Sequence, residues 1–195
     1  MSFRFHHKIF EKQTALLADF QDFEQKIYSL AQQLNVDFTQ YEIDHLSLRV
    51  NTEQTANAWL TRLLAYGSVL SDNQINGRVI YLIQLHEPLY LAKQWIDVVE
   101  LPFPKDKHYP QENWEHIEVV VPFLPNETAE EWLTRIKNTF LRNQPERFKV
   151  KTSEPKGCGE TLLNLSVAVS FVDKMQNPTC IKFHPYSIKQ IVSAV

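Results

Sequence analysis

The chain has 195 residues, of which 44% are hydrophobic and 12% aromatic, with a formal net charge of −3. This composition can bury a substantial core, and the scattered Lys and Arg residues argue against nucleic-acid binding. No apolar run approaches the ~20 residues of a membrane span, and two cysteines without a C-x-x-C pair are too few for a disulfide framework. We therefore expect a cytoplasmic protein that binds neither nucleic acid nor membrane.

Residues 1–40 predict an N-terminal helical extension. Apolar residues recur at spacings of three and four from Leu16 to Leu34, with polar residues between them. This spacing is typical of an amphipathic helix. The pattern leaves open whether the apolar stripe packs on its own chain or binds a partner.

Residues 41–104 predict a first module of one strand, one helix and three further strands. Asp44 and His45 head the first strand, and the helix runs from Thr52 to Ala65. The following strands are expected over residues 68–72, 78–86 and 95–101. Asn76-Gly77, between alternating segments, is a strong signal for a hairpin turn.

Residues 105–113 are expected to form a linker, and residues 114–195 a second module with the same order of elements. Its first strand carries Glu115 and His116 and ends at Pro122. Its helix spans residues 128–141 and begins with a capping-box pair, Thr128 and Glu131. Strands are expected over residues 148–152, 162–171 and 179–184.

The two modules share short motifs at a nearly constant offset, which indicates an internal duplication. An acid followed by a His heads both first strands, and the two His residues are 71 positions apart. Both helices contain the run Trp-Leu-Thr-Arg, which starts at Trp59 in the first and at Trp132 in the second, 73 positions apart. Both Trp residues lie on apolar helix faces and are expected in the core.

A strand, a helix and three strands used twice resemble the vicinal oxygen chelate superfamily over residues 41–186. This superfamily includes glyoxalase I, methylmalonyl-CoA epimerase and extradiol dioxygenases. The helical extension and the His-headed strands are most similar to the YecM-like family of uncharacterised proteins. The resemblance implies an α+β fold in which two repeated βαβββ modules form a cupped mixed sheet, with a metal site on the first and fourth strands.

Carried onto this sequence, the resemblance implies His45, Glu100 and His116 as ligands of a divalent metal. Imidazole and carboxylate suit Zn, Ni, Mn or Fe. The last strand departs from the commoner pattern because it supplies no Glu, and His184 is then the candidate fourth ligand. This departure puts a glyoxalase-like proton transfer in doubt, so Glu118 and Glu100 are the candidate catalytic acids or bases.

Strand alternation places further polar residues on the face that carries the candidate ligands. Arginine and lysine there favour carboxylate or phosphate groups. We therefore expect a small anionic substrate with paired oxygens, bound by Arg49, Arg78, Lys182, Ser47, Asn164 and Ser166.

Two classes of function fit these observations. The first is a metal-dependent isomerase, lyase or oxidoreductase, and the second is a non-catalytic protein that binds or sequesters a small ligand on the same fold. Because both modules lie in one chain, a monomer or a homodimer is expected. His86 and His108 are expected at the surface or in the linker, and Cys158 in a loop.

Overall fold

The computed structural model describes residues 7–75, 77–106, 108–141, 145–154 and 161–194. A short 3-10 helix, η2 (Lys8–Phe10), precedes one long helix, α1 (Thr14–Leu34). The buried apolar stripe of α1, which includes Phe20, Phe23 and Ile27, packs against the sheet of the same chain. No helix in the described part of the chain is long and apolar enough to span a membrane.

The first module has the predicted order, with one additional short strand. Its elements are β1 (Glu42–Arg49), α2 (Glu53–Leu64), β2 (Gly67–Ser71), β3 (Gln74–Ile75), β4 (Arg78–Leu91) and β5 (Gln94–Pro102). Ile75 pairs with Arg78, and Gly77 has a φ of 75°, so the predicted hairpin turn is confirmed.

The β4 strand is longer than the predicted segment, which ended at His86. It continues to Leu91, past Pro88, and turns into β5 at Ala92 and Lys93, which both have positive φ. The pairing of β4 with β5 is irregular between Gln84 and Leu89. Pro88 lies in this irregular stretch, where no ladder hydrogen bond is required of it.

The second module repeats the order. Its elements are β6 (Asn113–Val120), α3 (Ala129–Phe140), the 3-10 helix η3 (Pro145–Arg147), β7 (Phe148–Ser153), β8 (Ser166–Phe171) and β9 (Cys180–His184). The predicted capping box is present, since Thr128 and Glu131 bond each other's backbone N–H. The predicted strand over 162–171 is wrong in its first four residues, because β8 begins at Ser166 and Leu163 before it is 36% exposed.

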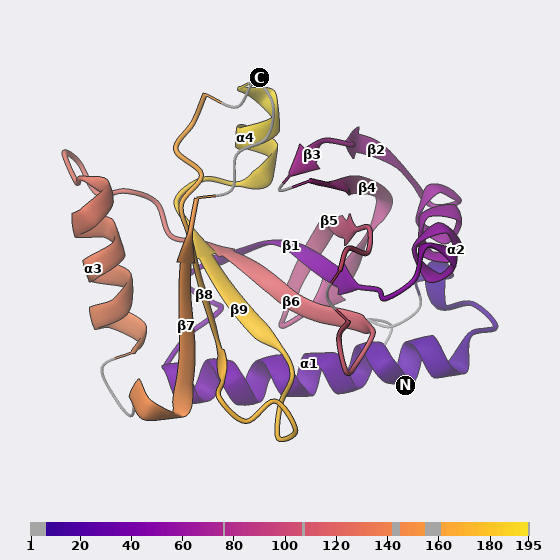
Figure 1. The fold of residues 1–195 in the computed structure, drawn as a ribbon, viewed down its shortest axis with the longest axis horizontal. Coiled ribbons are helices and arrows are strands. Elements are labelled where there is room, and N and C mark those ends of the chain that lie inside the picture. Colours follow the sequence, from indigo (N-terminus) through magenta and orange to yellow (C-terminus); the bar gives the residue numbers. More distant parts are fainter. Residues whose placement is uncertain (1–6, 76, 107, 142–144, 155–160, 195) are drawn as a thin grey trace.

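A last helix, α4 (Ile188–Ser193), was not predicted. It spans six residues, which is too few for a helical period to stand out. Ser187 and Gln190 form a capping box at its start, and Ile191 is its buried residue. Together these contacts hold α4 over one rim of the sheet (Figure 1).

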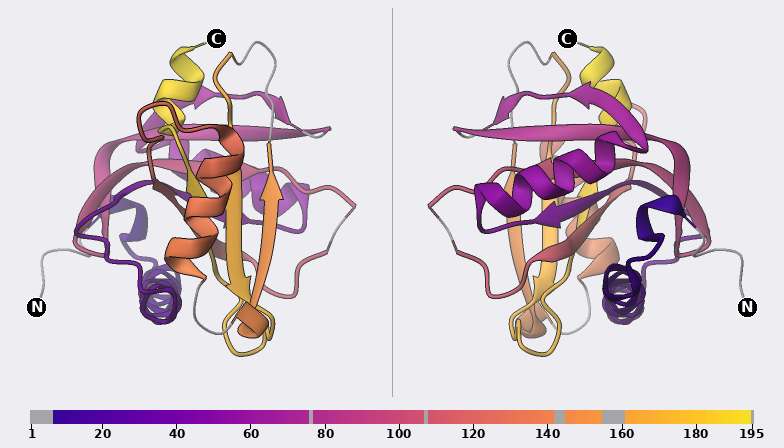
Figure 2. Two further views of the ribbon diagram at one scale, coloured as in Figure 1. Left: turned by 90° about the vertical axis from the view of Figure 1, so that its left-hand side faces the viewer. Right: turned by 90° about the vertical axis from the view of Figure 1, so that its right-hand side faces the viewer.

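The strand order is β2-β4-β5-β1-β6-β9-β8-β7, with β3 paired to β4. The two modules meet where β1 runs antiparallel to β6, while β1 is parallel to β5 and β6 is parallel to β9. Viewed from its two ends, the molecule has α3 outside the second module's strands and α2 outside the first module's strands (Figure 2). The predicted cupped mixed sheet of two βαβββ modules is confirmed.

The core lies between the helices and one face of the sheet, and both repeated Trp residues are buried in it as expected. Trp59 packs edge-on against Trp114, with 5.6 Å between ring centroids. Trp132 is fully buried, and its Nε1–H donates to the Val121 carbonyl at 2.7 Å. The opposite face of the sheet is left to line a cavity.

Candidate functional site

The concave face of the sheet encloses a cavity of about 690 Å³. Its lining includes most of the predicted substrate-binding residues, namely Arg49, Arg78, Lys182, Asn164 and Ser166. Ser47 instead lies behind the wall, where it is fully buried and its hydroxyl donates to Glu100 Oε1 at 2.6 Å. Ser47 therefore holds a carboxylate in place.

Two β-bulges build the acid–His pairs that head the first strands. Ile43 pairs with Val119 and His45 with Glu118, which leaves Asp44 as the extra residue on β1. Likewise Ser47 pairs with His116 and Leu48 with Trp114, which leaves Glu115 as the extra residue on β6. A bulge lets two successive side chains face the same side of a sheet. Each acid can therefore reach the His that follows it.

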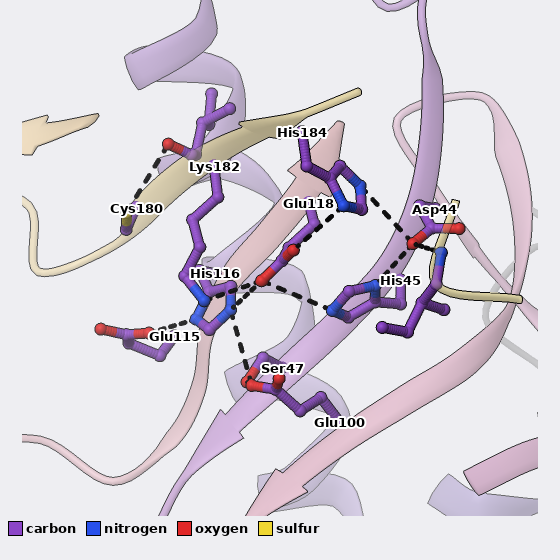
Figure 3. Close-up of polar contacts among 12 residues, drawn as sticks. Asp44, His45, Ser47, Glu100, Glu115, His116, Glu118, Cys180, Lys182 and His184 are labelled. Atoms are coloured by element: carbon purple, nitrogen blue, oxygen red, sulfur yellow. Dashed lines mark hydrogen bonds and ion pairs between the residues drawn. The ribbon is translucent and has the colours of Figure 1, made fainter. Parts of the chain in front are cut away.

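In the first pair, Asp44 fixes the orientation of His45. Asp44 Oδ2 contacts His45 Nδ1 at 2.8 Å and also accepts the backbone N–H of Ile188 at 2.8 Å (Figure 3). His45 Nε2 is left pointing at Glu118 Oε1, 3.6 Å away. That nitrogen is buried and has no hydrogen-bond partner in the described part of the protein.

In the second pair, Glu115 contacts His116 Nδ1 in the same way, and Arg49 Nη2 lies 3.3 Å from Glu115 Oε2. His116 Nε2 then faces two carboxylates, at 3.3 Å from Glu118 Oε1 and 3.7 Å from Glu100 Oε1. Both rings therefore turn Nε2 toward the same point between the modules (Figure 3). An acid that fixes the far nitrogen is the usual partner of a metal-binding His.

Glu118 occupies the centre of this arrangement. Besides the two His rings, its Oε1 contacts Lys182 Nζ at 2.7 Å, and its Oε2 lies 3.5 Å from His184 Nδ1. One ligand atom from each of His45, Glu100 and Glu118 lies within 4.8 Å of the others, which is the geometry of a group that could hold a metal ion. From the sequence, Glu118 is predicted to transfer protons and is not among the predicted ligands.

His116 and His184 lie beside this three-residue group. His116 contacts both carboxylates of this group, Glu100 and Glu118. His184 lies on the other side of Glu118, with its Nε2 3.5 Å from Asp44 Oδ2. Burial lowers the pKa of His184, so its ring is neutral at neutral pH.

Ionised carboxylates and positively charged groups stand side by side at the centre of the site. Burial alone would raise the pKa of Glu100, but its electrostatic interactions, first with Lys182 and then with His116, lower it to about 2. The pKa of Glu118 is likewise held well below its usual range, chiefly by Lys182 and His45. Burial opposes the charged form of His45, yet Glu118 and Asp44 raise its pKa to about 10. Ionised carboxylates and neutral imidazole are the forms that bind metal, so a metal ion at this centre would have to displace the proton of His45.

Two further His residues that the sequence analysis considered lie outside this centre. His86 and His108 are exposed, as expected. Cys158 lies outside the described residues. The other cysteine, Cys180, lines the cavity, but burial raises the pKa of its thiol to about 12, so it is not a thiolate nucleophile.

Comparison with known proteins places the chain among close relatives. A family model described as YecM protein matches residues 12–194. An uncharacterised protein of Haemophilus influenzae is 55% identical over 92% of this chain and 93% of its own length. Protein YecM of Escherichia coli is 38% identical, covering 92% of each chain. The solved structure of Protein EC4020, a structural genomics target, superposes with a TM-score of 0.78 at 33% identity, over 99% of both chains.

Proposed function

This chain belongs to the YecM family, and we propose that it binds a divalent metal ion between its two modules and holds a small anionic molecule against that ion. The observation that carries the proposal is the unpartnered, buried Nε2 of His45, which faces two ionised carboxylates. A buried polar atom without a partner is costly, so its retention at a cluster of ligand atoms favours a ligand there.

The donor set fits such an ion. His45, Glu100 and Glu118 would hold it, His116 is adjacent, and Asp44 and Glu115 fix the two imidazole rings. One nitrogen and two carboxylate oxygens suit Zn, Ni, Mn or Fe(II). When bound, the metal would supply Lewis-acid polarisation of paired substrate oxygens.

Arg49 is the residue best placed to orient the anionic molecule. Its Nη2 faces Glu115, while its Nε and Nη1 are buried and have no hydrogen-bond partner within the described residues. A guanidinium with free donors in a cavity wall matches the geometry of a carboxylate. Lys182 contributes a second positive charge from β9.

If the protein is an enzyme, the reaction would be an isomerisation, a lyase step or an oxidoreduction, with Glu100 or Glu118 moving a proton. One observation favours the second function, a non-catalytic binding or sequestering protein. The three lining carboxylates, Glu100, Glu115 and Glu118, are each in contact with a cation or a His ring in the part of the chain that the structure describes. A carboxylate held in this way is a weak general base.

Metal analysis of protein purified without added metal, followed by titration calorimetry with Zn²⁺, Ni²⁺ and Mn²⁺, tests the proposal. We expect one ion per chain in the natural protein and in His86→Ala, which removes an exposed His that does not line the cavity. His45→Ala and Glu118→Gln should lose the ion while keeping the native circular dichroism spectrum. Equal metal content in all four proteins would refute the site.

A further inference from the structure

The inner face of β8 forms a second polar region of the cavity, away from the metal centre. Strand alternation turns Ser166, Ala168 and Ser170 into the cavity, and Asn164, just before the strand, also lines it. Ala168 pairs with Lys151 on β7 and with Lys182 on β9. A methyl group thus lies between two lysines, with a serine two residues away on either side. The small side chains leave room for a ligand group.

The polar side chains of this wall are available for hydrogen bonding in the described part of the chain. Asn164, Ser166 and Ser170 are 8%, 5% and 6% exposed, and no hydrogen bond is found for their side chains within the described ranges. None of their polar atoms is among the buried atoms without a partner in the described part of the chain, so these atoms are open to the cavity that they line. Three available hydrogen-bonding side chains on a single wall can together bind a ligand that enters the cavity.

The charge of the cavity indicates what kind of ligand enters. Its described lining includes seven Lys or Arg residues but only three Glu, although the whole chain has a net charge of −3. Glu100 and Glu118 belong to the proposed metal centre, and Glu115 contacts His116 beside it. Lys149 and Lys151 line the wall beside β8, and neither makes an ion pair in the described part of the chain. A concave surface with this excess of positive charge concentrates anions.

The pairing registers place this wall at a defined separation from the metal centre. One row of paired residues crosses five adjacent strands in the order Lys151, Ala168, Lys182, Glu118 and His45. Neighbouring strands are ~4.8 Å apart, so Ala168 is roughly 10 Å from Glu118. The cavity of about 690 Å³ is also larger than a three-carbon acid needs. Both observations indicate a ligand with two separate polar ends.

We propose that the wall around Ala168 is a phosphate subsite. A phosphate ester would lie over Ala168 between Lys151 and Lys182, with Lys149 nearby and the hydroxyl groups of Ser166 and Ser170 donating to its oxygens. Phosphate carries nearly two negative charges and three acceptor oxygens, which matches several lysines and several separate donors better than one carboxylate does. This subsite rests on the proposed function in one respect only: the other end of the ligand, a hydroxy or oxo acid, is assigned to the metal centre.

The test compares 6-phosphogluconate with gluconate, which differ only in the phosphate group, by titration calorimetry on the metal-loaded protein. We expect the phosphorylated acid to bind at least ~10-fold more tightly than gluconate. Lys151→Met should reduce this ratio by about fivefold, the size expected of one partly exposed charge pair. Ala168→Glu, which fills the gap with a negative charge, should abolish the preference. Lys137→Met, which removes an exposed lysine from α3, should leave the ratio unchanged.

Inorganic phosphate, titrated in the presence of a chelator and followed by ³¹P NMR, separates this proposal from the metal proposal. Phosphate binding that persists without metal and weakens in Lys151→Met supports the subsite even if no metal ever binds. Bound metal together with equal affinity for gluconate and 6-phosphogluconate overturns the subsite and leaves the metal centre standing. A phosphate preference that Lys151→Met and Ala168→Glu both retain also overturns it.

Discussion

Lys182 and Glu118 lie opposite each other in the parallel pairing of β6 with β9, and Lys182 Nζ is 2.7 Å from Glu118 Oε1. Desolvation opposes the charge on this lysine, but Glu118 and Glu100 outweigh it and raise the pKa of Lys182. The ammonium group therefore stays charged at neutral pH. It lies beside the carboxylate that the proposed metal would need.

Replacing Lys182 with Met should strengthen metal binding, because the variant removes a positive charge that competes for Glu118. At the effective dielectric constant of a buried protein site, we expect a gain in affinity of about tenfold or more. Titration calorimetry with Mn²⁺ and Zn²⁺ measures the change, and Lys149→Met, which removes a charge at the cavity edge, should have a much smaller effect. Weaker binding in Lys182→Met would show that the lysine mainly positions Glu118.

Replacing Arg49 with Met should remove the preference for acids over their neutral analogues. The unpartnered Nε and Nη1 of Arg49 lie in the cavity wall, and a charge-assisted hydrogen bond contributes more than a neutral one. Thermal-shift measurements with hydroxy acids and the matching amides, with metal present, should show that acids stabilise the natural protein and lose most of that effect in the variant. Because Arg49 also contacts Glu115, metal content must be measured in parallel. Equal stabilisation of both proteins by the acids would contradict this role.

The site could be predicted in part from the sequence, because the acid–His motif occurs twice, at equivalent positions of a duplication. Strict alternation would send Asp44 and Glu115 to the face opposite their His neighbours. The two bulges reverse this, and no residue pattern in the strands signals them. The sequence also could not separate Ser47, which supports Glu100 from behind, from residues such as Ser166 that face the cavity. That distinction depends on the depth of each side chain in the folded sheet.

The fold was easier to predict than the site for a related reason. Helix caps such as Thr128 with Glu131, and the turn at Gly77, are local and leave local signals. No local signal marks Lys149 and Lys151 as residues of a cavity wall. Only the curvature of the whole sheet brings β7 into one cavity wall with β1 and β4, and curvature is a property of many strands together.

Acid should destabilise the metal-free protein through Glu100. The folded-state pKa of Glu100 is about 2, below its ordinary value of 4.5, so the group contributes stability above pH 4.5 and loses it as the pH falls toward 2. The shift corresponds to up to about 3 kcal/mol in the free energy of unfolding. Urea unfolding with a chelator present, at pH 6, 4 and 3, should show this decline. In Glu100→Gln the decline should be smaller, and an identical pH dependence in both proteins would contradict the assignment.

The repeated Trp residues should differ in how much their indole N–H contributes to stability. Trp132 Nε1 donates to the Val121 carbonyl at 2.7 Å inside the core, so Trp132→Phe leaves that carbonyl without its partner. We expect a loss of about 1–3 kcal/mol in the free energy of unfolding, beyond any change in packing.

Trp59→Phe is the matched control, because no hydrogen bond from the Trp59 indole is found in the described part of the chain. Its cost should come only from the lost ring volume against Trp114. Urea unfolding of the natural protein and both variants gives the comparison, and a Trp59→Phe variant destabilised as much as Trp132→Phe would mean that packing, rather than the hydrogen bond, accounts for the loss.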